Sequence, residues 1–282
     1  MRSLIVMEIK KALGNKWFLI ALVIGLGLAV HSAVGNGTYF NSVIYDNLSF
    51  MQDAYISLSL ASPFNLSLIA DFNQPTTDLF FLVLPLLAVI PYSWSLASEE
   101  KSGYFQQVVT RCSRRHYFTA KSIATFLSGA LVITIPVIVN FIILACVFPF
   151  YVPDVMESIY HGVFLESIWS DLYYTMPFAY FALYWTVVFV FSGLWAAFVS
   201  AVSHFLKNRV ALLIVPYLLL QGLYYLDYSV FVSLFDAHVD ITPFVYLRSA
   251  GDANILLIIG EFLILFCFVL SVVKAKRTED LV

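Results

Sequence analysis

The chain has 282 residues, of which 61% are hydrophobic and only 12% are charged, and its mean hydropathy is +0.87. A soluble globular domain carries about 25% charged residues, so the composition excludes an ordinary soluble domain. The net charge of −3 is small, and we expect no nucleic-acid partner.

Apolar residues gather into six long runs along the chain. A helix needs about 20 mostly apolar residues to cross a hydrocarbon core about 30 Å thick. The sequence therefore predicts an all-α membrane protein with six transmembrane helices in a single domain, residues 1–282. The fourth run could begin with an interfacial turn and the fifth is near the minimum length, so five or seven spans stay open as alternatives. The expected spans are residues 17–34, 79–97, 123–150, 176–205, 210–226 and 255–273.

The N-terminal segment, residues 1–16, has apolar residues near helical spacing with Arg2, Lys10 and Lys11 interleaved. This pattern predicts an amphipathic helix that lies along the membrane surface before the first span. The alternative is a basic flank that only directs insertion.

Basic residues are distributed very unevenly between the predicted loops. Fourteen of the 15 lysine and arginine residues precede span one, follow span six, or lie between spans two and three or four and five. The remaining loops hold only Arg248. Because basic flanks stay in the cytoplasm, we expect a multi-pass plasma-membrane protein with both termini cytoplasmic, from a bacterial source.

The first outer loop, residues 35–78, is long, acidic and interrupted by Pro63 and Pro75. We expect it to form short helices that lie on the outer surface.

The loop between spans two and three, residues 98–122, has the most distinctive pattern. Ser98 can cap a short helix whose first turn holds Glu99 and Glu100, where acidic side chains favour the helix dipole. A basic cluster follows, so we expect a short amphipathic helix between two spans. Its apolar stripe consists of Tyr104, Phe105, Val108 and Val109.

The order of residues in this loop resembles the ABC-2 family of ATP-binding-cassette permeases. That family has roughly an acidic-x-x-x-Gly segment, a leucine-rich helix, Ser/Thr-Pro-x-Ser-Arg and then Gly-Lys. Two positions depart from the pattern, because Cys112 stands where the family often has proline and Ala120 where it often has glycine. The matching positions are Glu99 or Glu100, Gly103, Val108, Val109, Ser113, Arg114 and Lys121.

The resemblance implies a permease subunit of an ATP-driven ABC exporter. Its loop would dock as a coupling helix on a separate nucleotide-binding ATPase subunit, with Glu99, Glu100, Arg111 and Arg114 setting the register at the rim. Two permease chains, identical or homologous, would meet in the membrane lipid and enclose a pathway for amphipathic cargo such as a peptide, a drug or a lipid. The alternative is a loop that only follows the positive-inside rule and lies at the headgroups.

The chain itself carries no ATPase signature. None of its 12 glycines precedes a lysine, which excludes a P-loop, so we expect no enzyme activity here and place ATP and Mg in the partner subunit. None of the five histidines begins His-Glu-x-x-His, and we predict no metal site and no cofactor in this chain.

Glu261 is the one ionisable residue that cannot avoid the interior of a predicted span, which makes it a candidate pathway residue. It could instead be protonated or reach the interface. In the fourth span Tyr180, Tyr184 and Trp185 could line a pathway or could serve packing. Two rival functions stay open: a secondary transporter driven by an ion gradient through Glu261, and a non-transporting immunity or regulatory membrane protein.

Overall fold

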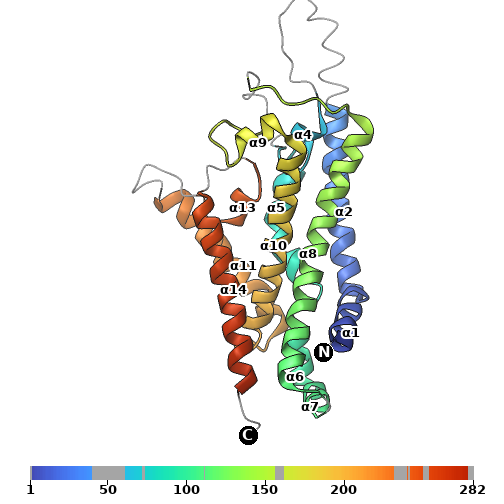
Figure 1. Cartoon of the computed structure of the whole chain (residues 1–282), viewed down its shortest axis with the longest axis vertical. Coiled ribbons are helices and arrows are strands. Elements are labelled where there is room, and N and C mark those ends of the chain that lie inside the picture. The colour runs from blue at the N-terminus through green and yellow to red at the C-terminus, as the bar shows by residue number, and fades with distance from the viewer. Residues whose placement is uncertain are drawn as a thin grey trace, which may run out of the picture.

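A computed structural model describes residues 2–39, 61–71, 74–110, 112–155, 162–231, 240, 242–249 and 254–278. Within these ranges the chain is helical and has no strand, which confirms the predicted all-α class. The long helices run side by side along one axis, and α1 (Arg2–Leu13) lies at the same end of the bundle as the C-terminal end of α14 (Ile255–Thr278) (Figure 1).

Five helices in the described part of the chain are long and apolar enough to cross a membrane, where the sequence predicts six. Four of them begin within one residue of a predicted span, whereas α8 begins nine residues before its expected start. Helix α11 continues as a π-helical turn, Asp227–Phe231. The five are α2 (Lys16–Tyr39), α8 (Arg114–Val147), α10 (Pro177–Val202), α11 (Arg209–Leu226) and α14 (Ile255–Thr278).

The second predicted span is divided into two helices. Helix α5 covers Pro75–Val89, and α6 begins only at Ser95, after a turn that contains Pro91. Fifteen residues make a helix about 22 Å long, which is shorter than the hydrocarbon core. The freed carbonyl groups find other partners, because the side chain of Trp94 donates to Ile90 O at 3.0 Å and that of Asn15 donates to Pro91 O at 3.2 Å.

Helices α2, α8 and α10 approach one another closely where small residues face each other. A Cβ atom added to Gly129 of α8 would lie 2.4 Å from Cβ of Ala196 on α10 and 2.9 Å from the carbonyl oxygen of Ala88 on α5. On α2, Gly25 faces Pro136 of α8 in the same manner, at 3.0 Å. Without a hydrophobic driving force between helices in lipid, such close contact stabilises the bundle through van der Waals attraction.

The described part of the first outer loop lies inside the bundle rather than on its surface, so the prediction of surface helices is wrong for residues 61–71. Every residue of this segment is buried, and it contains the short helix α4 (Pro63–Leu66). Phe64 packs among aromatic rings of α8 and α10, and Asn140 of α8 accepts a hydrogen bond from Leu68 N at 3.0 Å. The rest of the loop for which surface helices are expected, residues 40–60, 72 and 73, lies outside the described residues.

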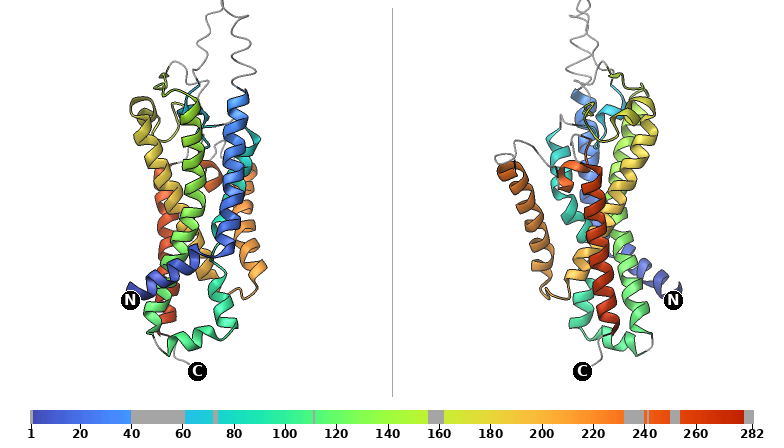
Figure 2. Two further views of the ribbon diagram at one scale, coloured as in Figure 1. Left: turned by 90° about the vertical axis from the view of Figure 1, so that its right-hand side faces the viewer. Right: turned by 60° about the vertical axis from the view of Figure 1, so that its left-hand side comes forward.

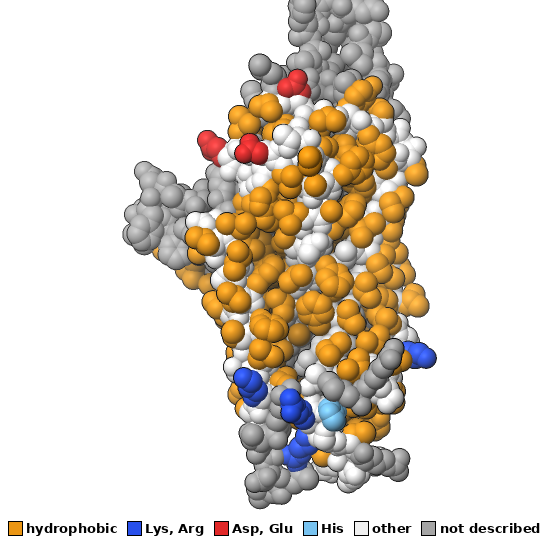
Figure 3. Space-filling model, viewed as in Figure 1, with side chains coloured by type: hydrophobic (Ala, Val, Ile, Leu, Met, Phe, Trp, Pro, Cys, Tyr) orange, Lys and Arg blue, Asp and Glu red, His pale blue; other side chains and the backbone are white. Residues whose placement is uncertain are grey.

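The bundle has an apolar middle and two polar ends of opposite charge. In Figure 3, hydrophobic side chains cover the middle of the visible face, while Lys and Arg gather at the end that holds α1 and Asp and Glu gather at the other. On the outer helices large apolar side chains are exposed, among them Leu256 (72%) and Ile264 (71%) of α14. This surface suits lipid and supports a multi-pass membrane protein.

Candidate functional site

The loop between α5 and α8 forms two short helices at the basic end. Helix α6 (Ser95–Lys101) and helix α7 (Tyr104–Val109) are joined at Gly103, whose φ of 73° is a left-handed conformation that favours glycine. Ser98 lies inside α6, so its predicted role as a helix cap is wrong. Figure 2 shows α7 below the ends of the long helices, with α1 crossing the bundle beside it.

A buried cluster of charged and tyrosine side chains lies directly above α7. Lys121 of α8, which is 1% exposed, forms ion pairs with Glu99 of α6 at 2.8 Å and with Glu8 of α1 at 3.2 Å. Lys11 pairs with Glu99 from the more exposed side. We call this set the Lys121 cluster; it consists of Glu8, Lys11, Tyr92, Glu99, Tyr117 and Lys121.

Two tyrosines complete the cluster. Tyr92, in the turn after α5, donates to Glu8 Oε2 at 2.7 Å, and its ring lies 4.4 Å from the Lys121 ammonium group. Tyr117 donates to Glu99 Oε2. Buried charges are tolerated when they are paired and hydrogen bonded, and here each carboxylate has a cation and a hydroxyl group as partners.

Helical spacing explains why these side chains meet. Leu4, Glu8 and Ala12 recur every four residues on α1 and are all buried, which makes them the face that packs against α8. Tyr117 and Lys121 are likewise four residues apart on α8. The cluster therefore joins α1, α6 and α8 at one point.

The charges shift the pKa values of Glu99 and Lys11, which both lie outside the membrane-spanning helices. Burial raises the pKa of Glu99, but the positive charge of Lys121 and the hydrogen bonds from Lys11, Lys121 and Tyr117 outweigh it, so the pKa lies below the ordinary value of 4.5. Burial lowers the pKa of Lys11, but its hydrogen bond to Glu99 and the negative charges of Glu99 and Glu8 outweigh that, so the pKa lies above 10.5.

Helix α7 packs against the bundle mainly through one face. Phe105 and Val108 pack against Leu96, Tyr117 and Phe118, while the side chains of the opposite face are exposed. The expected stripe is therefore divided, because Tyr104 is 38% exposed and its ring lies 4.8 Å from the Lys11 ammonium group of α1 instead. The exposed face consists of Tyr104, Gln106, Gln107 and Thr110.

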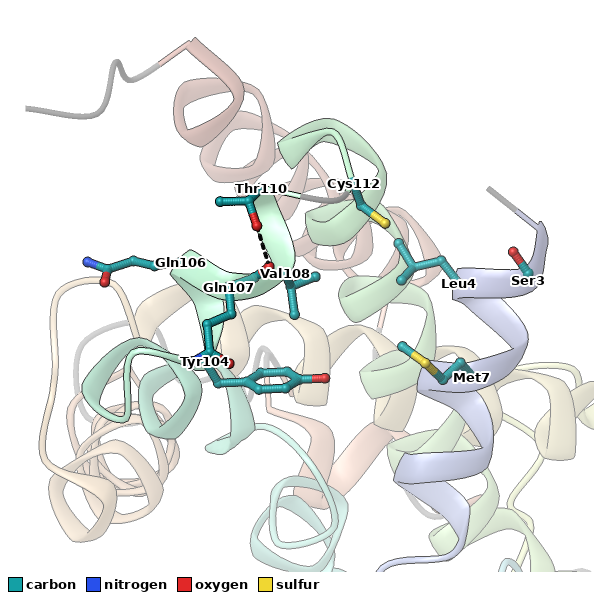
Figure 4. A pocket seen from close by; sticks show the side chains of 9 residues that line it. All are labelled: Ser3, Leu4, Met7, Tyr104, Gln106, Gln107, Val108, Thr110 and Cys112. Atoms are coloured by element: carbon teal, nitrogen blue, oxygen red, sulfur yellow. Dashed lines mark hydrogen bonds between the residues drawn. The ribbon is translucent and has the colours of Figure 1, made fainter.

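An open groove separates α7 from α1. It has a volume of about 730 Å³. In Figure 4, Leu4 and Met7 extend from α1 toward Tyr104 and Val108, and Thr110 donates to the carbonyl oxygen of Gln107 at 2.7 Å. The lining is mainly apolar and amide, which suits a protein surface better than a small charged ligand. The lining residues are Ser3, Leu4, Met7, Tyr104, Gln106, Gln107, Val108, Thr110 and Cys112.

The other predicted coupling residues are dispersed. Glu100 Oε1 lies 3.3 Å from His204 Nδ1, and Ser113 hydrogen bonds to His116 at 2.8 Å. Val109 and Arg114 are partly buried, and Arg111 lies outside the described residues. Glu99, expected at the rim of a partner contact, lies in the interior instead.

The predicted pathway residues are not among those that line the groove between α1 and α7. Tyr180 and Tyr184 are buried in the core, with ring centroids 4.7 Å apart, and Trp185 is partly buried beside Phe141. Glu261 of α14 accepts a hydrogen bond of 2.7 Å from the buried Tyr246.

Sequence reasoning overlooked Glu8, Tyr92 and Tyr117. A signal for Glu8 is present, because it stands midway between Leu4 and Ala12 on the buried face of α1. Within the described residues no group of His, Cys, Asp and Glu is arranged to hold a metal ion. The chain matches no protein-family model, no curated protein and no solved structure.

Proposed function

We propose that this chain is the permease subunit of an ATP-driven exporter of the ABC-2 type. The observation that carries the proposal is α7, a short helix with one exposed face, fixed at the basic end of a membrane bundle. Its support is the loop motif over residues 98–122 together with this position at the basic end. In this proposal α5, the turn after it and the first residues of α6, up to Ala97, make the sixth crossing, and Glu99 lies beyond it on the cytoplasmic side.

The basic end faces the cytoplasm in this proposal, because lysine and arginine gather there. Helix α1 lies along the inner surface, and the exposed face of α7 and the groove beside it contact a separate ATPase subunit. The apolar and amide side chains of the groove would pack against the ATPase subunit, and charged residues at the edge of the contact would determine how that subunit is oriented.

The Lys121 cluster gives α7 a mechanical connection to the spans. A displacement of α7 moves α6 through the intervening Gly103, and α6 is tied to α1 and α8 through Glu99. Force applied by the ATPase at α7 therefore reaches α8, which packs against α2 and α10. A second permease chain, identical or homologous, completes the pathway for amphipathic cargo.

Purification from native membranes in a mild detergent tests the proposal. We expect an ATPase subunit to co-purify with the chain and its ATP hydrolysis to fall when Gln106→Ala and Gln107→Ala are combined. Glu166→Ala, at the opposite end, serves as the control and should leave hydrolysis unchanged. The proposal fails if no ATPase is retained and transport persists without one.

A secondary carrier remains the second candidate because of one contact, the hydrogen bond from Tyr246 to Glu261. A carboxylate within an apolar helix is costly and is usually kept for a purpose. Transport that follows an imposed proton or sodium gradient, and is abolished by Glu261→Gln, would favour this candidate over the exporter.

A further inference from the structure

A second cavity lies between the end of α1 and α6 at the basic end of the bundle. Its volume of about 480 Å³ falls within the range of about 300–1,000 Å³ that is typical of small-ligand sites. In contrast to the α1–α7 groove, its lining is rich in hydroxyl and charged groups. The side chains that matter here are those of Lys11, Asn15, Trp94, Ser95, Ser98 and Ser102, and the Glu99 carboxylate, which is paired with Lys11 and Lys121, also lies on the wall.

One of the hydroxyl groups on this wall lacks a partner. Ser95, Ser98 and Ser102 are spaced by three and four residues, so they lie on one face of α6 and its end. Ser95 is only 5% exposed, and its Oγ has no hydrogen-bond partner among the described residues. A buried hydroxyl group without a partner is unfavourable, and because this Oγ is inaccessible to solvent, an oxygen-bearing ligand would satisfy it once the side chain turns into the cavity.

One cation, Lys11, lines the cavity, and a second, Arg209, lies against two of the residues that line it. Arg209, at the start of α11, donates to Ser98 Oγ at 2.7 Å, and its guanidinium group lies 4.9 Å from the centre of the Trp94 ring. Lys11 is 43% exposed and pairs with Glu99, whose charge is also opposed by Lys121. An ammonium group has three N–H donors, so Lys11 can serve both Glu99 and an incoming anion.

The cavity lies at the depth where a membrane span begins. Trp94, on its wall, packs edge to face against Trp17, with ring centroids 6.4 Å apart. Trp17 is the second residue of α2 and is 41% exposed. Tryptophan gathers at the interface between hydrocarbon and water, which is where the phosphate groups of lipids lie.

We propose that this cavity binds the phosphate of an anionic phospholipid headgroup, held by the charges of Lys11 and Arg209 and by the hydroxyl groups of α6. A free phosphate ion shares this chemistry, but the position beside Trp17 and Trp94 favours a lipid. The inference does not depend on the transport proposal, because it concerns only the membrane in which the bundle lies.

Native mass spectrometry of the purified full chain in a neutral detergent tests this site. Separate samples receive phosphatidylglycerol, phosphatidylcholine or inorganic phosphate. We expect phosphatidylglycerol adducts to exceed phosphatidylcholine adducts by about fivefold or more, since each surface cation contributes about that factor. Arg209→Gln should lower phosphatidylglycerol occupancy about fivefold, and Ser95→Val should also lower it.

Lys207→Gln is the matched control, because it removes the same charge from an exposed residue two positions earlier. It should leave occupancy unchanged. Arg209→Lys keeps the charge and should retain most of the binding, which separates loss of the site from loss of the fold. Equal adducts of the two lipids, an equal loss in Lys207→Gln, or binding of inorganic phosphate with no further binding of lipid would each overturn the proposal.

Discussion

Lys121 of α8 donates a hydrogen bond of 3.2 Å to Glu8 of α1, and both side chains are 1% exposed. Ionic groups so well buried carry a desolvation cost of several kcal/mol each, by order of magnitude. The cost is offset here because Lys121 pairs with both Glu8 and Glu99, and Glu8 also accepts a hydrogen bond from Tyr92. The pair fixes the N-terminal helix against the long helix α8.

Removal of Lys121 should unfold this end of the bundle more easily. Lys121→Met retains the length of the side chain but leaves Glu8 and Glu99 buried without their shared cation. Breaking a buried ion pair in this way costs about 3–5 kcal/mol. We therefore expect a clearly lower midpoint of thermal unfolding for the protein in detergent micelles.

Lys101→Met is the control for this change, because Lys101 is exposed at the end of α6. Its effect should stay within about 0.5 kcal/mol. Equal midpoints for Lys121→Met and the native chain would show that the cluster does not stabilise the fold.

The contribution of Glu99 should depend on pH in a defined direction. Its folded-state pKa is depressed, so the stability it contributes is fully present above its ordinary value of 4.5 and is lost as the pH falls through the lowered value. The raised pKa of Lys11 sets the upper limit, since its contribution is present below 10.5 and is lost only as the pH rises through the folded-state value.

Glu99→Gln should therefore unfold at a lower temperature than the native chain near neutral pH. The difference should shrink in acid, because the native carboxylate also becomes neutral there. Melting curves over a pH series measure this difference, with the exposed Glu166→Gln as a control. A difference that grows as the pH falls would contradict the direction of the shift.

The membrane class follows from composition alone, but the number of long helices does not. A hydropathy pattern treats residues 79–97 as continuous, because Pro91 and the serine residues beside it lower the average only slightly. The break after α5 depends on tertiary partners. Its carbonyl groups accept hydrogen bonds from Trp94 and Asn15. Asn15 lies between α1 and α2, 76 residues before Pro91, so the sequence around the break does not show this partner.

The candidate site could also be predicted only in part, because some of its contacts come from residues far apart in the sequence. The loop motif directs attention to Glu99 and Lys121, which the structure places 2.8 Å apart, yet it also suggests that Glu99 faces a partner. Glu8, the other carboxylate that pairs with Lys121, is 113 residues away from it along the chain. Only the packing of α1 against α8 reveals that these charges neutralise one another.

Enlarging Gly129 should separate the central helices. A Cβ atom there meets Ala196 and a backbone carbonyl oxygen of α5, neither of which can turn aside. Overpacking costs about 1–3 kcal/mol, so Gly129→Val should lower the unfolding midpoint. Gly27→Val is the matched control, because no atom lies within 4 Å of its added Cβ. Similar midpoints for the two variants would contradict the close approach of α8 and α10.

Arg248, the basic residue of the acidic end, holds residues 61–71 in place. Its Nη1 lies 2.5 Å from Asp78 Oδ1 at the start of α5, and its Nη2 donates to the carbonyl oxygen of Asp71 at 3.0 Å. The adjacent Ser249 donates to Ile69 O at 2.9 Å, so two side chains tie α13 (Pro243–Tyr246) and the turn after it to the buried segment.

Arg248→Gln should loosen this segment without unfolding the bundle. Asp78 is 62% exposed at its side chain, so the ion pair contributes only about 0.2–1 kcal/mol, and the global midpoint should change little. Hydrogen exchange of the amides in residues 61–71 should nevertheless quicken about two- to fivefold, because local opening requires less free energy. Arg115→Gln, an exposed arginine at the opposite end, is the control. Unchanged exchange in residues 61–71 would mean that burial of Phe64 and its neighbours holds the segment without help from Arg248.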